Sequence, residues 1–365
     1  MSRALWFASP GDPALRTGGY LYNAAICARL GVHGFEVRAI RLPDAFPYPS
    51  VADQEEAAVL LGAVPSDDLL VVDGLAFGAV SSDVIAAIRA PTIALVHHPL
   101  ADETGLTPSA VAAFEASERG ALASTIGVVT SSPSTGTALV DRFGVPRDRL
   151  ETVIPGVEKP ASRPAGRDDN ASPLILSVGS LTHRKGHDVL IDALARLRDH
   201  PWRAVIVGSP DLAPDVAQAL ASQVEDAGLS DRVMLAGTLE AEALQQLYRS
   251  ADVFALATRH EGYGMVFSEA MVHGLPIVSC AVGAVPDTVP EATGLLVPAD
   301  DAVALASALE QLLEDPALYG AKAAGAARVG AALPDWDDAA AEFASALRRL
   351  STDTESSERS VGASQ

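Results

Sequence analysis

Two glutamates, Glu261 and Glu269, lie either side of a short segment in which a Gly-Xaa-Gly turn directly follows the first of them. A carboxylate can accept hydrogen bonds from a pair of sugar hydroxyls, and backbone N–H groups at the start of a helix can bind a phosphate. The segment therefore suits a ligand that carries both anionic and hydroxyl groups, such as a nucleotide sugar. For an isolated pair of glutamates, an exposed loop acid and a solvated helix acid would be the alternative interpretation.

The elements around these glutamates can be predicted from hydropathy. The apolar run from Val253 to Leu256 indicates a short buried strand, and the spacing from Met265 to His273 indicates a helix that stops at Gly274-Leu275-Pro276. The glutamates then bracket a strand-loop-helix corner, with Glu269 on the order of 10 Å beyond Glu261. The N–H groups near Gly264, Met265 and Val266 would begin the helix and face an anion.

A second motif places two cations at the end of another predicted strand. Arg184 and Lys185 follow the apolar run from Leu174 to Val178, just before a predicted helix. Arginine can bind phosphate oxygens with its planar fork, and lysine adds a mobile charge. Together they would stabilise a diphosphate leaving group, although a basic surface loop is the alternative interpretation.

Composition limits the classes of partner. The 365 residues carry a formal charge of -21, so nucleic acid and anionic bilayers should be repelled at long range. No apolar run is long enough for a transmembrane helix, and the N-terminus lacks a signal-peptide pattern, so we expect a cytoplasmic protein. The two cysteines, Cys27 and Cys280, are expected to be buried thiols.

Short apolar runs alternate with helical stretches twice along the chain, which predicts two parallel sheets covered by helices. The predicted strands are 5–8, 36–40, 69–73, 92–96, 126–130, 174–178, 203–207, 233–236, 253–256 and 276–279, and the predicted helices include 20–30, 181–198, 211–227 and 239–249. The predicted domains are 1–157, a linker at 158–172, a second domain at 173–333, a C-terminal helix at 334–350 and a disordered tail at 351–365.

Four motifs carry a resemblance to a known family: Gly179-Ser180-Leu181 with Arg184-Lys185-Gly186, Glu261-Gly262-Tyr263-Gly264-Met265-Val266 with Glu269, Gly274-Leu275-Pro276-Ile277-Val278, and Thr293-Gly294-Leu295-Leu296-Val297-Pro298. In these motifs the chain resembles the family 4 retaining glycosyltransferases of GT-B fold. The resemblance implies an α/β fold of two Rossmann-like, doubly wound domains that face a central cleft. It also implies that the C-terminal helix returns to pack on the first domain.

The resemblance assigns roles to individual residues. It implies that Glu261 contacts the donor sugar, that Glu269 contacts the ribose, and that Arg184 and Lys185 contact the diphosphate, together with the backbone near Gly264, Met265 and Val266. The nucleobase would lie near Gly208, Thr238 and Leu239. Gly18 and Gly19 look like the family's glycine loop, and His97 resembles its active-site histidine by position. A histidine at a strand end is otherwise often structural.

We therefore expect a glycosyltransferase that moves a sugar, most simply from a uridine diphosphate donor, with retention of configuration. No metal ligands are expected, because His97 and His98 are adjacent and point to opposite faces of their strand. No cofactor is expected either, because the segment after the first strand lacks the Gly-Xaa-Gly-Xaa-Xaa-Gly fingerprint of nicotinamide-binding domains. A sugar-nucleotide epimerase, a phosphorylase or a non-catalytic nucleotide-sugar binding protein remain alternatives. The acceptor and the oligomeric state cannot be read from the sequence.

Overall fold

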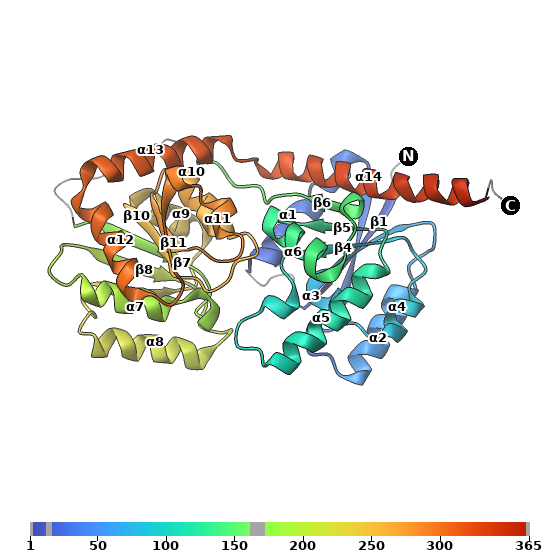
Figure 1. Ribbon diagram of the computed structural model, residues 1–365, viewed down its shortest axis with the longest axis horizontal. Coiled ribbons are helices and arrows are strands. Elements are labelled where there is room, and N and C mark those ends of the chain that lie inside the picture. The colour runs from blue at the N-terminus through green and yellow to red at the C-terminus, as the bar shows by residue number, and fades with distance from the viewer. Residues whose placement is uncertain (1–2, 12–16, 161–171, 363–365) are drawn as a thin grey trace. The chain divides into compact units, whose positions relative to one another are not determined.

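The computed structural model describes residues 3–11, 17–160 and 172–362. The chain forms two compact units, shown in Figure 1. Unit 1 comprises Met1–Gly156 and Pro334–Gln365, and unit 2 comprises Val157–Leu333. Within the expected linker, residues 161–171 lie outside the described part of the chain.

Unit 1 is built on a six-stranded sheet in which every pairing is parallel, in the order β2-β1-β3-β4-β5-β6. Strands β3 and β4 are buried along their whole length, as expected for apolar runs inside a parallel sheet. The strands are β1 (Arg3–Pro10), β2 (Phe35–Leu42), β3 (Leu69–Asp73), β4 (Thr92–Val96), β5 (Gly127–Thr130) and β6 (Leu150–Thr152).

Helices cover both faces of this sheet. One face packs against α2 (Val51–Gly62), α3 (Gly74–Phe77), α4 (Ser82–Ala87), α5 (Pro108–Ala123) and α6 (Pro133–Phe143). The other face packs against α1 (Gly18–Cys27), the 3-10 turn η1 (Leu30–His33) and the C-terminal helix α14 (Trp336–Gly362). Short 3-10 turns η2 (Leu100–Asp102) and η3 (Arg147–Arg149) complete the unit.

Helix α14 belongs to unit 1 although it lies at the far end of the sequence. Its apolar side chains Phe343, Leu347 and Leu350 are buried in the same core as Tyr22 and Ile26 of α1. The helix continues through Gly362, so residues 351–362 are helical where the sequence predicts an irregular tail. Their polar composition gives no core-forming pattern, so helical continuation from α14 was not predicted.

Unit 2 repeats the same plan with the strand order β12-β11-β10-β7-β8-β9, again with parallel pairing throughout. The strands are β7 (Leu174–Val178), β8 (Arg203–Val207), β9 (Val233–Gly237), β10 (Val253–Leu256), β11 (Ile277–Cys280) and β12 (Gly294–Val297). One face packs against α7 (His187–Arg196), α8 (Pro214–Asp226) and α12 (Ala302–Glu314).

The other face of unit 2 packs against a second group of helices, and Figure 1 shows the two groups on opposite sides of the sheet. This second group is α9 (Ala241–Ser250), α10 (Met265–Val272), α11 (Val285–Thr288) and α13 (Pro316–Ala332). The turns η4 (His183–Lys185) and η5 (Glu291–Thr293) lie between strands and helices. The expected α/β fold of two doubly wound domains is confirmed.

The order in which successive strands join the sheet reverses once in each unit, between β1 and β3 in unit 1 and between β7 and β10 in unit 2. Loops that leave neighbouring strands at such a point diverge to opposite faces, which opens a binding crevice at the carboxyl ends of the strands. The predicted site residues follow these strands or their neighbours.

Two strands and the starts of several helices differ from the sequence-based prediction. Strands β6 and β12 were not predicted: β6 contains a single apolar side chain, and the apolar run of β12 is only three residues long. The predicted helix at 181–198 begins only at His187, after a separate turn that carries Arg184 and Lys185. Among the described residues, no helix combines the length and apolar character needed to cross a membrane.

Candidate functional site

Glu261 and the two predicted phosphate cations form one ion-paired cluster in unit 2. Lys185 donates from Nζ to Glu261 Oε1 over 2.6 Å, and Arg184 lies 3.9 Å from Glu261 Oε2. Arg184 also donates to the carbonyl of His260 over 3.2 Å. Because Lys185 follows β7 and Glu261 follows β10, the cluster spans the point where strand order reverses. The two motifs that the sequence analysis treated separately are therefore in direct contact.

The carboxyl group of Glu261 is held in its charged form. Burial opposes ionisation, but the positive charges of Lys185 and Arg184 and the hydrogen bond from Lys185 outweigh it and keep the pKa of Glu261 below its ordinary value. The side chain is only 5% exposed, whereas that of Arg184 is 24% exposed. Two cations and one carboxylate leave this cluster one positive charge in excess, which favours an anionic ligand.

Backbone geometry explains how Lys185 comes to face Glu261. Gly186 has a φ of +64°, and a Cβ atom there would lie 1.9 Å from the carbonyl oxygen of Ala257. Only glycine permits this close approach of the β7 loop to the β10 loop. The next residue, His187, is buried, and its Nε2 lies 3.1 Å from the carbonyl oxygen of Gly179. Burial lowers the pKa of His187 to about 4, so the ring is neutral at pH 7.

The start of helix α10 lies beside the same cluster. Gly264 precedes the helix with a φ of +85°, and a Cβ atom there would lie 2.5 Å from Phe267 Cδ2 and 3.7 Å from Glu261 Cγ. Met265 and Val266 are the first helical residues, so their N–H groups have no carbonyl partner within the helix. The predicted backbone anion site therefore lies at a helix N-terminus next to Glu261.

Glu269 lies further along α10 in a different environment. Its Oε2 accepts a hydrogen bond of 2.7 Å from the hydroxyl of Tyr248 in α9. Burial raises the pKa of Glu269 above its ordinary value, and the Tyr248 hydrogen bond only partly offsets it. The ring of Tyr248 stacks on His273 with centroids 5.3 Å apart. The partner of Glu269 is thus an uncharged hydroxyl group, whereas the partners of Glu261 are two cationic side chains.

The residues predicted near the nucleobase follow β8 and β9. Gly208 lies against the loop after β7, since a Cβ atom there would be 1.9 Å from the Gly179 carbonyl oxygen. Thr238 and Leu239 follow the edge strand β9. Leu239 lines an apolar groove of about 380 Å³ together with Val205, Met234, Ala236, Ala243, Gln246, Leu247 and Ser250. The structure therefore packs Gly208 against the cation loop and places Leu239 on an apolar wall beside α9.

The remaining predicted residues come together in unit 1. A Cβ atom on Gly19 would lie 3.0 Å from His97 Cδ2, so the glycine turn at Gly18 and Gly19 packs against the histidine ring. His97 Nε2 lies 3.1 Å from Asn23 Oδ1 and 3.9 Å from Asp73 Oδ2. His98, by contrast, lies 3.6 Å from Glu103, so the two histidines have different partners.

A buried polar chain fixes the ring of His97. Asn23 donates from its amide to Asp73 Oδ2, and Asp73 Oδ1 accepts a hydrogen bond of 2.8 Å from the backbone N–H of Leu75. Tyr22 packs edge-on against the His97 ring at a centroid distance of 5.1 Å. Burial lowers the pKa of His97 despite the nearby Asp73, which favours the neutral imidazole.

Three polar residues in or beside these two clusters, Asp73, Asn23 and Arg259, were missed by the sequence analysis. Asp73 ends a strand whose other residues are all apolar, and that position was the available signal. Asn23 lies in the buried face of α1, and Arg259 lies two residues before Glu261. Their roles depend on contacts between elements far apart in sequence, so no local pattern identified them.

Among the described residues, one group of side chains has the spacing of metal ligands: His200, Glu310 and Glu314. The two ring nitrogens of His200 face different carboxylates, Nε2 lying 3.1 Å from Glu310 and Nδ1 lying 3.3 Å from Glu314. A single ion could be reached by only one of these nitrogens. The arrangement fits a histidine whose ring bridges two carboxylates of α12, and it shares no residue with the predicted site.

Comparison with known proteins agrees with this geometry. Residues 172–315 match the family model described as Glycosyl transferases group 1, and this range lies within unit 2. A D-inositol 3-phosphate glycosyltransferase of Xylanimonas cellulosilytica is 33% identical over 239 residues, which are 61% of this chain and 57% of that protein. The lipopolysaccharide core biosynthesis mannosyltransferase LpsB of Rhizobium meliloti is 35% identical over 183 residues, covering 48% of this chain and 51% of that protein.

The chain thus spans about half the length of the curated relatives it matches. Among solved structures, sucrose-phosphate synthase from Thermosynechococcus elongatus superposes with a TM-score of 0.81 at 23% identity, covering 96% of this chain and all of that one. HepE of Anabaena in complex with UDP and glucose superposes with a TM-score of 0.72 at 18% identity, covering 94% of this chain and 99% of that one. Residues 172–315 are therefore similar in sequence to the group 1 glycosyl transferases, and the chain has the GT-B fold.

Proposed function

We propose that the protein is a glycosyltransferase that moves a sugar from a nucleoside diphosphate donor to an acceptor of unassigned identity. The observation that carries the proposal is the cluster of Lys185, Arg184 and Glu261 at the switch point of the unit 2 sheet, beside the start of α10. It offers positive charge for a diphosphate and a charged carboxylate for sugar hydroxyls within a few ångströms of each other.

The electrostatics of the cluster support leaving-group stabilisation as its main role. Charge builds on the diphosphate as its bond to the sugar breaks, and fixed cations stabilise that charge more in the transition state than in the ground state. Lys185 is held by Glu261 before any ligand arrives. This preorganisation reduces the rearrangement that the reaction requires. The N–H groups of Met265 and Val266 would add to the anion site.

The sugar and the nucleoside are proposed to contact the flanking residues. Glu261 would accept hydrogen bonds from the sugar hydroxyls, which its low pKa favours because the carboxylate stays charged. Glu269 would contact the ribose, and the backbone at Gly208 with Thr238 and Leu239 would contact the base. Uridine is the favoured base, since HepE was solved with UDP.

His97 is proposed to contact the transferred sugar or its oxocarbenium-like transition state. A neutral imidazole adds a hydrogen-bonding group without repelling developing positive charge, and Asn23 fixes the direction of its Nε2. Gly18 and Gly19 would let the backbone approach the donor phosphates. We infer retention of configuration through attack by the acceptor on the face that the diphosphate leaves, with neither a metal ion nor a cofactor required.

The acceptor is left open because the named relatives differ in theirs. One group of relatives is named for inositol 3-phosphate and another for the lipopolysaccharide core. Two free cysteines, of which Cys280 is buried, suit a reducing compartment, so we propose that the protein acts in the cytoplasm.

The proposal can be tested with purified protein and a panel of nucleotide sugars. Thermal shift should identify the donor because a ligand that binds the folded state raises its stability. Transfer to candidate acceptors would then be followed by NMR of the anomeric proton, with an unchanged configuration expected. Conversion of donor without acceptor would indicate an epimerase, and binding without any turnover would indicate a non-catalytic protein. Failure of every nucleotide sugar to bind would exclude the proposal.

A further inference from the structure

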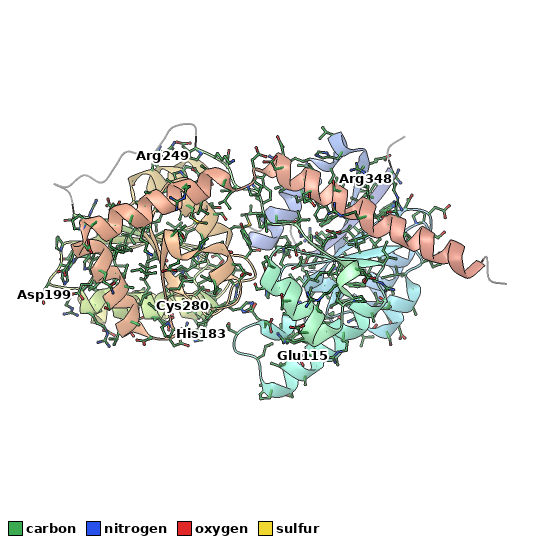
Figure 2. All side chains as sticks on the ribbon, turned by 45° about the horizontal axis from the view of Figure 1, so that its top comes forward. Glu115, His183, Asp199, Arg249, Cys280 and Arg348 are labelled. Atoms are coloured by element: carbon green, nitrogen blue, oxygen red, sulfur yellow. The ribbon has the colours of Figure 1, made fainter. Side chains whose placement is uncertain are left out.

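The turn that carries both phosphate cations is held by a residue outside the proposed donor contacts. This turn is η4, which begins at His183 (Figure 2). Its own backbone bonds are few, since Lys185 N–H donates to the Thr182 carbonyl and Gly186 N–H to the His183 carbonyl. Three-residue 3-10 turns have little intrinsic stability. The position of Lys185 therefore depends on neighbouring segments.

The carbonyl groups of η4 accept hydrogen bonds from the segment just before Glu261. The backbone N–H of Arg259 donates to the Arg184 carbonyl over 2.8 Å, and the hydroxyl of Thr258 donates to the same oxygen over 3.1 Å. The guanidinium of Arg259 donates to the carbonyl of His183. One residue thus holds two consecutive carbonyls of the turn.

The same guanidinium is fixed by two carboxylates from other elements. It donates to Asp188, in the first turn of α7, with bonds of 2.9 and 2.7 Å, and to Asp300, after β12, with a bond of 2.7 Å. The Arg259 side chain is only 12% exposed. A forked, charge-assisted arrangement of this kind is both strong and directional.

The backbone of Asp300 adopts an unfavourable conformation at the position where its side chain pairs with Arg259. Asp300 has a φ of +59° and is the only non-glycine residue with positive φ in the described part of the chain. Such a conformation is unfavourable for most side chains, although aspartate tolerates it better than most. It is kept here where the carboxylate meets Arg259.

We propose that Arg259 is a positioning residue that sets the distance between the phosphate cations and Glu261. Its backbone belongs to the loop of Glu261, and its hydrogen bonds hold the turn of Arg184 and Lys185, so it connects the two halves of the site. The inference rests on the proposed donor site for its functional consequence. The positional claim, however, can be measured without any ligand.

Two variants and a matched control test the inference. Arg259→Gln removes the fork and the charge, and Arg259→Lys keeps the charge but not the fork. Arg232→Gln is the control, because Arg232 also lies in unit 2 and donates to three backbone carbonyls, those of Trp202, Arg198 and His200. It shares no partner with Arg259, and its loss should lower thermal stability without moving η4.

The first measurement is the rate at which an amine-acylating reagent modifies Lys185 in the folded protein, read by mass spectrometry against Lys322. We expect the rate at Lys185 to rise about tenfold in Arg259→Gln, by about half that factor in Arg259→Lys, and to stay unchanged in the control. An unchanged rate at Lys185 in Arg259→Gln would overturn the positional claim, whether or not the protein binds a nucleotide.

The second measurement is the dissociation constant for UDP by calorimetry, well below the melting temperature of each variant. We expect about tenfold weaker binding for Arg259→Gln, partial recovery for Arg259→Lys and no change for Arg232→Gln. A lower melting temperature with unchanged affinity would reduce Arg259 to a stabilising role. No binding of UDP by the native protein would instead count against uridine as the base, leaving the labelling result to decide the role of Arg259.

Discussion

The two sheets reverse strand order in the same way but carry different chemistry at the reversal. In unit 2, Lys185 and Arg184 face the carboxylate of Glu261, and all three are charged groups. In unit 1, His97 lies against Asn23 and Asp73, and burial favours the neutral ring. The comparison shows that strand order positions loops, whereas the residue types on the loops decide whether the site attracts anions or directs hydrogen bonds.

The largest effect is expected from removing the charge of Glu261. Glu261→Gln should lower the transfer rate by about 100- to 1,000-fold, since the sugar loses a charged acceptor and Lys185 loses its fixed partner. The measurement is the initial rate with the donor found by thermal shift. Glu310→Gln, at an exposed ion pair of the same unit, should leave that rate unchanged. A full rate in Glu261→Gln would contradict the central role of the unit 2 cluster.

The second prediction concerns the pH dependence of stability, because unit 1 buries an acidic group and unit 2 buries a basic one. Burial raises the pKa of Glu118 in unit 1 to about 7 from 4.5, and burial lowers the pKa of His187 in unit 2 to about 4 from 6.5. Between pH 4.5 and 7, folded Glu118 holds a proton that the unfolded chain has released, so stability from this group rises as pH falls. Between pH 6.5 and 4, the unfolded chain protonates His187 first, so stability from that group falls.

Each of these shifts corresponds to about 3 kcal/mol across its window. We expect acidification from pH 7 to 5 to stabilise unit 1 through Glu118 and to destabilise unit 2 through His187. Hydrogen exchange of amides in α5 and α7, corrected for intrinsic rates, would measure this. Glu118→Gln should remove the trend in α5 alone, and His187→Gln should remove it in α7 alone. The same trend in both units would contradict the assignment.

A smaller effect is expected from Lys185, one of the two cationic side chains proposed to bind the diphosphate. Lys185→Gln should weaken UDP binding about tenfold and reduce its dependence on salt, because one charge of the cluster is lost. Calorimetry at two salt concentrations would measure both. Lys322→Gln provides the control, since Lys322 donates to the carbonyl of Glu291 in the same unit, away from the cluster. Equal UDP affinities of Lys185→Gln and the native protein would show that Lys185 does not contact the diphosphate.

The smallest effect is expected in unit 1, at the contact between Gly19 and His97. In Gly19→Ala the added Cβ would lie 3.0 Å from His97 Cδ2, so the ring must shift by a few tenths of an ångström. We expect the transfer rate to fall about three- to tenfold while UDP affinity stays unchanged. Gly31→Ala is the control, because among the described residues no atom beyond its chain neighbours and its own helical turn lies within 4 Å of a Cβ placed there. A loss of UDP affinity in Gly19→Ala would indicate a phosphate contact instead.

Much of the fold followed from local patterns in the sequence. The apolar runs at 69–73, 92–96 and 174–178 form strands β3, β4 and β7 with the predicted limits. These strands are buried on both faces, so hydropathy alone marks them. The edge strands β6 and β12 were missed because they are short: β6 has one apolar side chain and β12 a run of only three.

The candidate site was predicted in parts rather than as a whole. Glu261, Arg184 and Lys185 stand out by residue type and by their place after strands. Their ion pairing depends on Gly186, whose missing side chain lets one loop approach the next within the sheet. Asp73 and Arg259 act through partners dozens of residues away, so only the folded chain shows their role.

The sequence by itself determined the alternation of strands and helices, the two-sheet α/β class and the residue types able to bind a diphosphate sugar, because these depend on local hydropathy and side-chain chemistry. Only the tertiary structure decided that Lys185 pairs with Glu261 and that His97 is held by Asn23 and Asp73. The physical reason is that strand order in a parallel sheet brings distant loops together, and contacts of a few ångströms between them leave no local trace in the chain.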